Sequence, residues 1–258
     1  MPRLTPVLRS SIAGVSFTIR CDEPTLVAGL CQRWRALPPG PRRPDLLFDA
    51  CFRPRQPRLS LNGRSRCVAR DANHLLAELE LAIYDELATR TPSTPIHAAA
   101  VAFGDAAILL AGPSGAGKST LAWGLIQRGA DYLAEEHVFL DDRGALSGLP
   151  RALSFASPAR DDLGLSWAPR VRLEAPRVLG VVLLELPRGA GARRLTPAEA
   201  AAGLTQHLHR PPRDADLSRI VRTLAGVPAL ALGLEGVAAA LDQVITSLEP
   251  TLCGAPVR

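Results

Sequence analysis

Lysine is almost missing from this chain. Thirty of its residues are Lys or Arg, and Lys118 is the one lysine among them. Arginine therefore supplies nearly every positive charge. The position that keeps lysine is one where a compact ammonium on a flexible stem serves and a planar guanidinium does not. We therefore expect Lys118 to have a specific chemical role.

Other scarce features narrow the class of protein. Aromatic residues make up only 4% of the chain, and its arginines are scattered, so the net charge of +5 does not predict nucleic-acid binding. No stretch approaches the roughly 18 apolar residues that span a bilayer. The first twenty residues lack the continuous apolar segment of a secretory signal. We expect a cytoplasmic protein that binds neither nucleic acid nor membrane.

Cysteine is also sparse and unpatterned. The five cysteines are an odd number and include no CxxC pair, and no histidine lies at metal-ligand spacing from them. They are Cys21, Cys31, Cys51, Cys67 and Cys253. This arrangement predicts incidental or buried thiols, with neither a disulfide nor a zinc site.

The lone lysine lies within GPSGAGKST, which matches the phosphate-binding pattern GxxxxGK[ST]. The apolar run Ala106–Ala111 before it reads as a buried strand, and Leu121–Arg128 after it reads as a helix stopped by Gly129. A strand, a glycine loop and a helix N-terminus direct backbone N–H groups and partial positive charge at a phosphate. The residues expected to contact the nucleotide are Gly112, Pro113, Ser114, Gly115, Ala116, Gly117, Lys118, Ser119 and Thr120. The pattern predicts an ATP or GTP site.

An acidic pair follows the helix. Glu135 and Glu136 interrupt an otherwise apolar strand segment, where glutamate is a poor strand former. A magnesium nucleotide is a natural partner, because one carboxylate can bind the metal and the other can take a proton from an attacking hydroxyl. The alternative is a solvent-exposed strand end.

The segment Ile96–Leu140 resembles bacterial HPr kinase/phosphorylase, and especially the short HPr-kinase-like proteins found with peptide-modification genes. Some of those relatives phosphorylate a C-terminal serine of lasso peptides. The resemblance implies an α/β fold with a P-loop nucleotide core of the HPr kinase/PEP-carboxykinase type, ATP and Mg²⁺ as cofactors, and a serine on a peptide or small protein as acceptor. It also suggests a homo-oligomer.

Within that resemblance each site residue has an expected role. Glu135 is the base, Ser119 and Glu136 bind the metal, and Lys118 holds phosphate. His97, which leads the strand before the loop, assists together with Arg151.

Two departures from the family pattern keep other functions open. The family usually has aspartate where this chain has Glu135, and the stretch Ser147–Phe155 keeps Arg151 but offers no further acid. A nucleotide-binding regulatory protein without phosphotransfer is one alternative. A nucleotidyl transferase or small-molecule phosphotransferase is another.

The chain is expected to form two domains, a small α/β module over residues 1–92 and the P-loop kinase-like domain over residues 93–258. In the first, an Asn62-Gly63 hairpin precedes a long helix capped by Asp71. In the second, Val178–Leu186 reads as a strand buried on both faces.

Two segments of the second domain, one basic and one rich in charge and proline, are candidates for acceptor contact. Thr196 and Glu199 form a capping-box pattern that predicts a helix running to about Arg210. The segment His207–Arg213 faces either an acidic acceptor or solvent, with solvent the simpler reading. The proline-rich segment Pro158–Pro176 is a candidate substrate loop.

Overall fold

A computed structural model describes residues 4–34, 37–52, 56–150, 171, 176–186, 191–233 and 236–252 of the chain. It is a mixed α/β protein with three sheets, which agrees with the predicted class at that level. The chain divides into two compact units, Met1–Pro92 and Ser93–Arg258. Arg151 and nearly all of the candidate loop Pro158–Pro176 lie outside the described residues.

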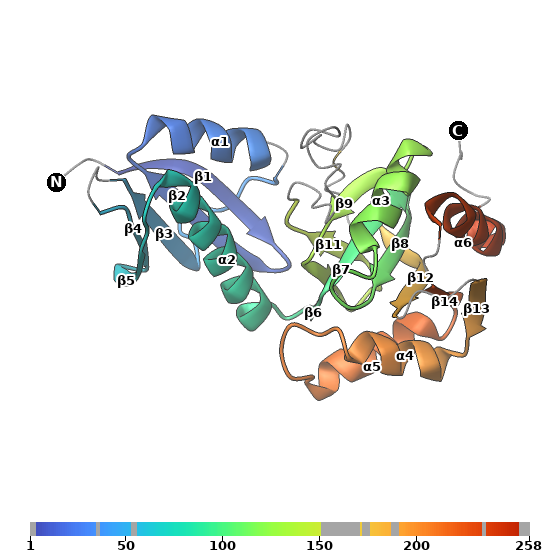
Figure 1. Ribbon diagram of the computed structural model, residues 1–258. Coiled ribbons are helices and arrows are strands. Elements are labelled where there is room, and N and C mark those ends of the chain that lie inside the picture. Colours follow the sequence, from blue (N-terminus) through green and yellow to red (C-terminus); the bar gives the residue numbers. More distant parts are fainter. Residues whose placement is uncertain are drawn as a thin grey trace. The chain divides into compact units, whose positions relative to one another are not determined.

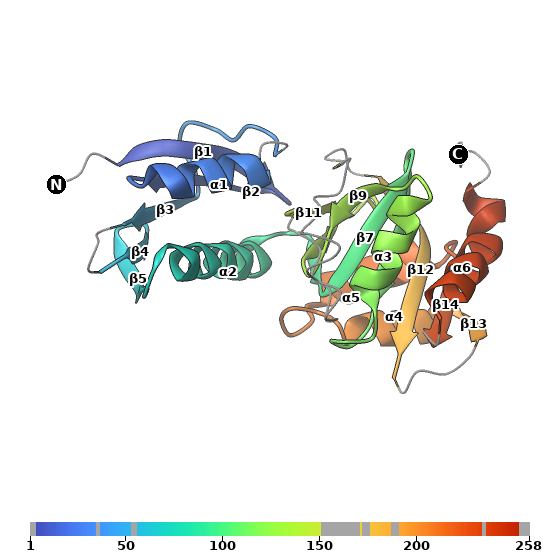
Figure 2. The same cartoon turned by 45° about the horizontal axis from the view of Figure 1, so that its top comes forward.

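The first unit is a five-stranded sheet with two helices. Its strands lie in the order β1-β2-β3-β4-β5, and only the pairing of β2 with β3 is parallel. Figure 2 shows α1 along β1 and β2, and α2 beside β3 and β4. The elements are β1 (Thr5–Ile12), β2 (Val15–Cys21), α1 (Pro24–Trp34), β3 (Leu46–Cys51), β4 (Arg58–Leu61), β5 (Arg64–Val68) and α2 (Ala72–Arg90).

Local sequence explains the turns of this unit. Asn62 and Gly63 both take positive φ angles, as a two-residue hairpin between right-twisted strands requires. Asp71 caps α2 by accepting a hydrogen bond from the His74 backbone N–H. Cys21 and Cys67 carry free thiols.

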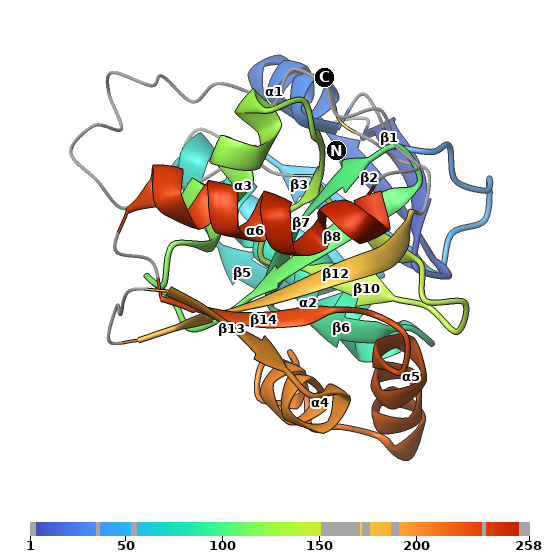
Figure 3. The same cartoon turned by 90° about the vertical axis from the view of Figure 1, so that its right-hand side faces the viewer.

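The second unit is built on a six-stranded sheet in the order β13-β14-β12-β8-β7-β9, accompanied by a three-stranded sheet β11-β10-β6. In Figure 3 the strands β7, β8, β12, β14 and β13 lie side by side, with α6 across them. The strands are β6 (Thr94–Ile96), β7 (Ala98–Phe103), β8 (Ala106–Ala111), β9 (Asp131–Ala134), β10 (Val138–Leu140), β11 (Leu146–Gly148), β12 (Arg177–Glu185), β13 (Gly191–Leu195) and β14 (Ala229–Gly233). The helices are α3 (Lys118–Gln127), α4 (Pro197–Thr205), α5 (Asp214–Leu224) and α6 (Val237–Leu252).

Strand alternation distributes this unit's apolar side chains between two cores. Alternate residues of β8 and β12, such as Leu110 and Val182, pack against α3 and α6. Their neighbours, such as Leu109 and Val181, pack against α4, α5 and the three-stranded sheet. Figure 1 shows α3 and α6 above these strands and α4 and α5 below them. Both faces of the central strands are therefore buried, which explains the continuous apolar run of β12.

One predicted helix ends earlier than expected. The capping box of Thr196 and Glu199 is present, but α4 stops at Thr205 rather than near Arg210. The next residues turn back to β6, where Leu208 forms a bridge with Ile96. Backbone pairing with the sheet thus replaces the last predicted turns of helix, and His207–His209 lie in the connection between α4 and α5.

No described helix is both long enough and apolar enough to cross a membrane.

Candidate active site

The glycine loop Gly112–Gly117 connects the end of β8 to the start of α3, as the sequence predicts. Gly112 has φ of +155°, and a Cβ there would lie 2.7 Å from the carbonyl oxygen of Leu184 on β12. Gly117 has φ of +103° and begins α3 with no side-chain cap. The first backbone N–H groups of a helix have no partner inside the helix. The loop therefore has the backbone form of an anion cradle.

Lys118 folds back onto this loop. Its Nζ donates hydrogen bonds to the carbonyls of Gly112, at 2.9 Å, and Pro113, at 3.2 Å. The residue is only 6% exposed. Burial lowers the pKa of Lys118, and the nearby carboxylates of Glu136 and Glu135 oppose that shift. A buried ammonium that is only partly compensated by carbonyls and carboxylates suits a phosphate oxygen.

Sheet register brings His97 and the acidic pair to the same edge as the loop. Ala98 at the start of β7 pairs with Ala111 at the end of β8, so His97 lies beside the beginning of the loop. Ala134 at the end of β9 pairs with Ala100 of the same β7. Residues just beyond β9 therefore reach the edge where the loop begins.

The strand pairings on either side of Glu135 and Glu136 explain why polar residues interrupt an apolar segment here. Ala100 pairs with Ala134 in the large sheet, and Ile96 pairs with Val138 in the small one. The segment Glu135–His137 spans the crossing from one sheet to the other. Between these two pairings the segment is not part of a regular strand. Its side chains therefore need not alternate between the two faces of a sheet and can point toward the loop.

Glu135 lies against the glycine loop. It is 1% exposed, and the Ser119 hydroxyl donates a short hydrogen bond to one of its carboxylate oxygens. The sequence-based prediction paired Ser119 with Glu136 instead. The reason for the difference is the backbone of Glu136, whose φ of +71° is in the left-handed region and turns its side chain elsewhere. Such a conformation costs a non-glycine residue about 1 kcal/mol and is kept where surrounding structure imposes it.

Glu136 faces His97. The distance between His97 Nδ1 and a Glu136 carboxylate oxygen is 3.5 Å, and each side chain is about one-third exposed or less, at 27% and 34%. Burial lowers the pKa of His97, and Lys118 lowers it further, while Glu136 opposes the shift. The His97 ring is therefore mainly neutral at pH 7, and its contact with Glu136 is not a full ion pair at that pH.

From the sequence, His207 and His209, in the connection between α4 and α5, are recognised only as part of a basic segment and are not predicted to lie beside His97. The backbone N–H of His97 donates to the His207 carbonyl at 2.6 Å, and the backbone N–H of His209 donates to the Pro95 carbonyl at 3.1 Å. The His209 ring stacks on His137, with centroids 4.0 Å apart, and meets His97 edge-on. Burial, followed by Lys118, lowers the pKa of His207. Four of the five histidines of the chain lie here, but only His207 and His209 are close together in the sequence, so the sequence carried little signal of this cluster.

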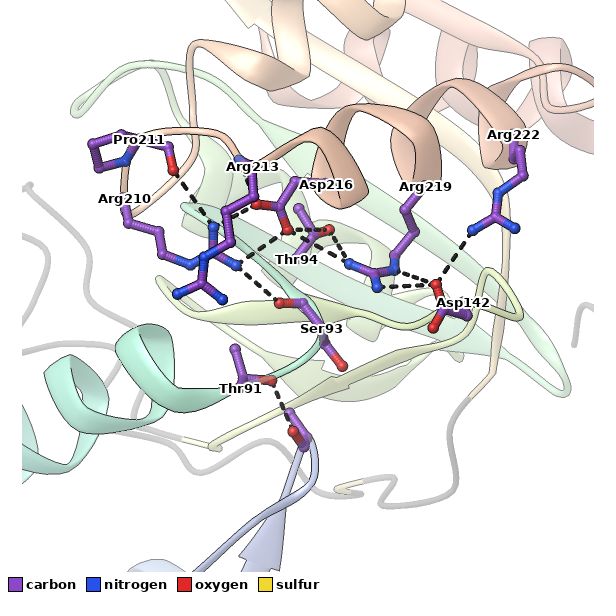
Figure 4. Close-up of polar contacts among 11 residues, drawn as sticks. Thr91, Ser93, Thr94, Asp142, Arg210, Pro211, Arg213, Asp216, Arg219 and Arg222 are labelled. Carbon is purple, nitrogen blue, oxygen red and sulfur yellow. Dashed lines mark hydrogen bonds and ion pairs between the residues drawn. The ribbon is translucent and has the colours of Figure 1, made fainter.

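Arg210 pairs with a carboxylate of its own unit. Its guanidinium pairs with the buried carboxylate of Asp216, which also accepts from the Thr94 hydroxyl at 2.9 Å. Arg219 in turn donates to the Thr94 hydroxyl at 2.7 Å and reaches Asp142 (Figure 4). The sequence leaves open whether this segment faces an acceptor or solvent; for Arg210 the structure shows an internal carboxylate as the partner.

Within the described ranges, no group of three or more His, Cys, Asp or Glu side chains is arranged to hold a metal ion. A magnesium ion bound together with a nucleotide needs fewer protein ligands, because phosphates and water supply the rest. Ser119 and Glu135, joined by their hydrogen bond beside the loop, have the donor set for that arrangement.

No protein-family model matches the chain, and no curated protein matches it significantly. Among solved structures, it is similar to the HPr(Ser) kinase/phosphatase from Coxiella burnetii, with 15% identity and a TM-score of 0.34. The match covers 62% of this chain and 99% of the other. Similarity at this level assigns no activity, so the function must be argued from the residues of the site.

Proposed function

We propose that this protein is an ATP-dependent kinase that phosphorylates a serine hydroxyl on a peptide or small protein. The observation that carries the proposal is the placement of two carboxylates beside one glycine loop in different environments. Glu135 is buried on Ser119, whereas Glu136 is partly exposed beside His97. A phosphotransferase needs both a metal-side carboxylate and an accessible base.

The chain's own residues would divide the work as follows. The loop amides and Lys118 bind the phosphates, and Ser119 with Glu135 holds the metal side. Bound ATP would supply the phosphoryl group, and Mg²⁺ would neutralise charge on its phosphates. Compared with the sequence-based prediction, the two glutamates exchange roles.

Glu136 then accepts the proton of the attacking serine hydroxyl. The hydroxyl oxygen forms a bond to the γ-phosphorus as the bond to the leaving ADP oxygen breaks, and the hydroxyl proton moves to the Glu136 carboxylate. His97, neutral at pH 7 and 3.5 Å away, borders this carboxylate and limits water on that side. The choice of serine and of a peptide acceptor rests on the family resemblance of Ile96–Leu140.

The test compares Glu136→Gln with Glu135→Gln. Glu136→Gln keeps the side-chain shape but cannot take a proton, so we expect phosphotransfer to fall on the order of 10²-fold or more with little change in ATP affinity. Glu135→Gln removes a metal-side charge, so the gain in ATP affinity that Mg²⁺ provides should shrink. Calorimetric titration of ATP with and without Mg²⁺ measures binding. Mass spectrometry of peptides encoded beside the gene measures transfer.

Two outcomes contradict the proposal. If the wild-type protein binds MgATP but phosphorylates no such peptide, the regulatory alternative is favoured. If Glu136→Gln transfers phosphate at the wild-type rate while Glu135→Gln does not, the base is Glu135 and the original assignment of roles is restored.

A further inference from the structure

The connection between α4 and α5 reaches the acidic pair through one side chain. The ring nitrogen Nε2 of His209 lies 2.7 Å from the backbone carbonyl oxygen of Glu136. A carbonyl oxygen can only accept, so Nε2 carries the hydrogen and donates it. The donor, His209, lies 73 positions after Glu136 in the sequence.

The backbone of this connection is itself fixed to the sheet. Leu208 bridges Ile96, and the neighbouring amides of His97 and His209 bond across the same edge. Arg210, the next residue, is tied to Asp216 at the start of α5 (Figure 4). His209 therefore starts from a backbone position held on both sides, which gives its ring a defined direction.

Glu136 needs a partner of this kind. Its left-handed φ of +71° is uncommon for a residue with a side chain, and it requires surrounding groups that hold it. The His209 ring contacts the carbonyl of this residue and stacks at 5° interplanar angle on His137, the next residue. It thus holds both sides of the bend from which the two glutamate side chains point in different directions.

We propose that His209 is a positioning residue for the acidic pair: its hydrogen bond to the Glu136 carbonyl fixes the bend that sends Glu135 to Ser119 and Glu136 to His97. The inference rests on the proposed function for its effect on phosphotransfer. The geometric part, that the Nε2 donor holds the bend, is independent of that function.

Packing alone is the competing explanation. If the stacked rings merely fill space, any side chain of similar volume serves, and the donor is irrelevant. The position of the donor separates the two explanations. The side-chain nitrogen of glutamine reaches as far as His Nε2, whereas that of asparagine corresponds to Nδ1 and falls short. Leucine fills volume without a donor.

The experiment compares His209→Gln, His209→Asn and His209→Leu with the wild type, and uses His74→Gln in the first unit as a histidine control. The first measurement is hydrogen exchange of the backbone amides in residues 131–140, without nucleotide. We expect faster exchange in the Asn and Leu variants and near wild-type exchange in the Gln variant.

The second measurement is the affinity for ADP with Mg²⁺ and with EDTA. Misplacing a group that orients metal ligands typically costs 10- to 100-fold in metal affinity. We expect the Mg²⁺-dependent gain in affinity to fall by about tenfold or more in the Leu and Asn variants, with most of it restored in the Gln variant.

Two results overturn the proposal. One is unchanged exchange of residues 131–140 in His209→Leu, and the other is exchange in His209→Gln as fast as in His209→Leu. Failure of the wild-type protein to bind ADP would contradict the proposed function instead, and the exchange measurement would still decide whether His209 holds the bend.

Discussion

At the scale of single residues, this protein separates two carboxylates that are adjacent in sequence. In a regular strand, consecutive side chains point to opposite faces and share one backbone geometry. Here Glu136 leaves that geometry, and the pair acquires a buried member on Ser119 and a partly exposed member beside His97. Different environments for two carboxylates are the usual route to different chemical roles.

Lys118 is the residue whose replacement should be most informative. Lys118→Ala removes the ammonium that faces the loop, so we expect nucleotide turnover to fall on the order of 10²-fold or more. Lys118→Arg should fail nearly as badly, because a guanidinium does not fit where Nζ bonds the carbonyls of Gly112 and Pro113. Turnover and a thermal melt measure activity and folding separately.

Arg128→Lys is the matched control for that substitution. Arg128 lies just past α3 and pairs with Asp242 on the surface, so exchanging its cation should leave turnover unchanged. Full activity in Lys118→Arg would show that a generic positive charge suffices at the loop.

At the scale of elements, a buried ionic cluster anchors α5 to β6. Asp216 is 1% exposed and lies between Arg210, Arg219 and the Thr94 hydroxyl. Burial raises the pKa of Asp216, but hydrogen bonds from Arg210, the Arg213 backbone and Thr94 outweigh it, and the net shift is downward. The carboxylate is therefore charged at neutral pH and compensates two arginines.

Asp216→Asn should be strongly destabilising. The amide keeps the shape but leaves buried arginine charge uncompensated, for which a loss of about 3–5 kcal/mol is typical. Urea denaturation measures this loss. Asp142→Asn is the control, because Asp142 contacts the same Arg219 but has a 70% exposed side chain, and exposed pairs contribute about 0–1 kcal/mol. Equal losses in the two variants would contradict this account of the cluster.

Much of the element order could be predicted, for identifiable reasons. The apolar runs of β8 and β12 are visible because both faces of these strands are buried. The strands β1 and β13 could not be found in this way, because they lie at sheet edges: β13 is almost wholly exposed, and β1 is buried only at Ser10 and Ile12. No hydrophobic period marks a strand whose outer residues face solvent.

The sequence also predicts the glycine loop and points to the acidic pair as a site feature. It does not predict which of the two glutamates contacts Ser119. Which glutamate meets Ser119 depends on one φ angle at Glu136. The approach of His209 depends on the early end of α4 and the bridge between Leu208 and Ile96. Those contacts link residues far apart in sequence, so local sequence patterns cannot predict them.

At the scale of the whole molecule, partly buried neutral histidines should make stability depend on pH. The pKa values of His97 and His207 are lowered from 6.5, first by burial and then by Lys118. The unfolded chain then binds more protons than the folded chain in the window below pH 6.5, so the free energy of unfolding falls as pH decreases through that window. Well above pH 6.5 both states are neutral at these groups, and the contribution is constant.

Thermal melts from about pH 8 to pH 5 should therefore show a decline that begins near the ordinary histidine pKa. His207→Gln should reduce the slope, because glutamine does not titrate. Protonation of carboxylates causes a second decline in stability, which can be distinguished from the first because it occurs at lower pH. Hydrogen bonds from the Thr196 backbone and hydroxyl, with Arg193, lower the pKa of Glu199 from 4.5 to about 2, so its contribution is lost progressively as pH falls from 4.5 to about 2. An unchanged slope in His207→Gln would contradict this assignment.

The folded-back ammonium of Lys118 also has a consequence for chemical labelling. As the sole lysine, it is the one side chain in the chain that amine-directed acylating reagents can modify, apart from the terminal amine. Its lowered pKa increases the uncharged, nucleophilic fraction at a given pH. Each side-chain acyl group counted by mass therefore reports on one atom, the Nζ that contacts the carbonyls of Gly112 and Pro113. Any molecule that covers this atom becomes detectable as a loss of that single label, whatever its own chemistry.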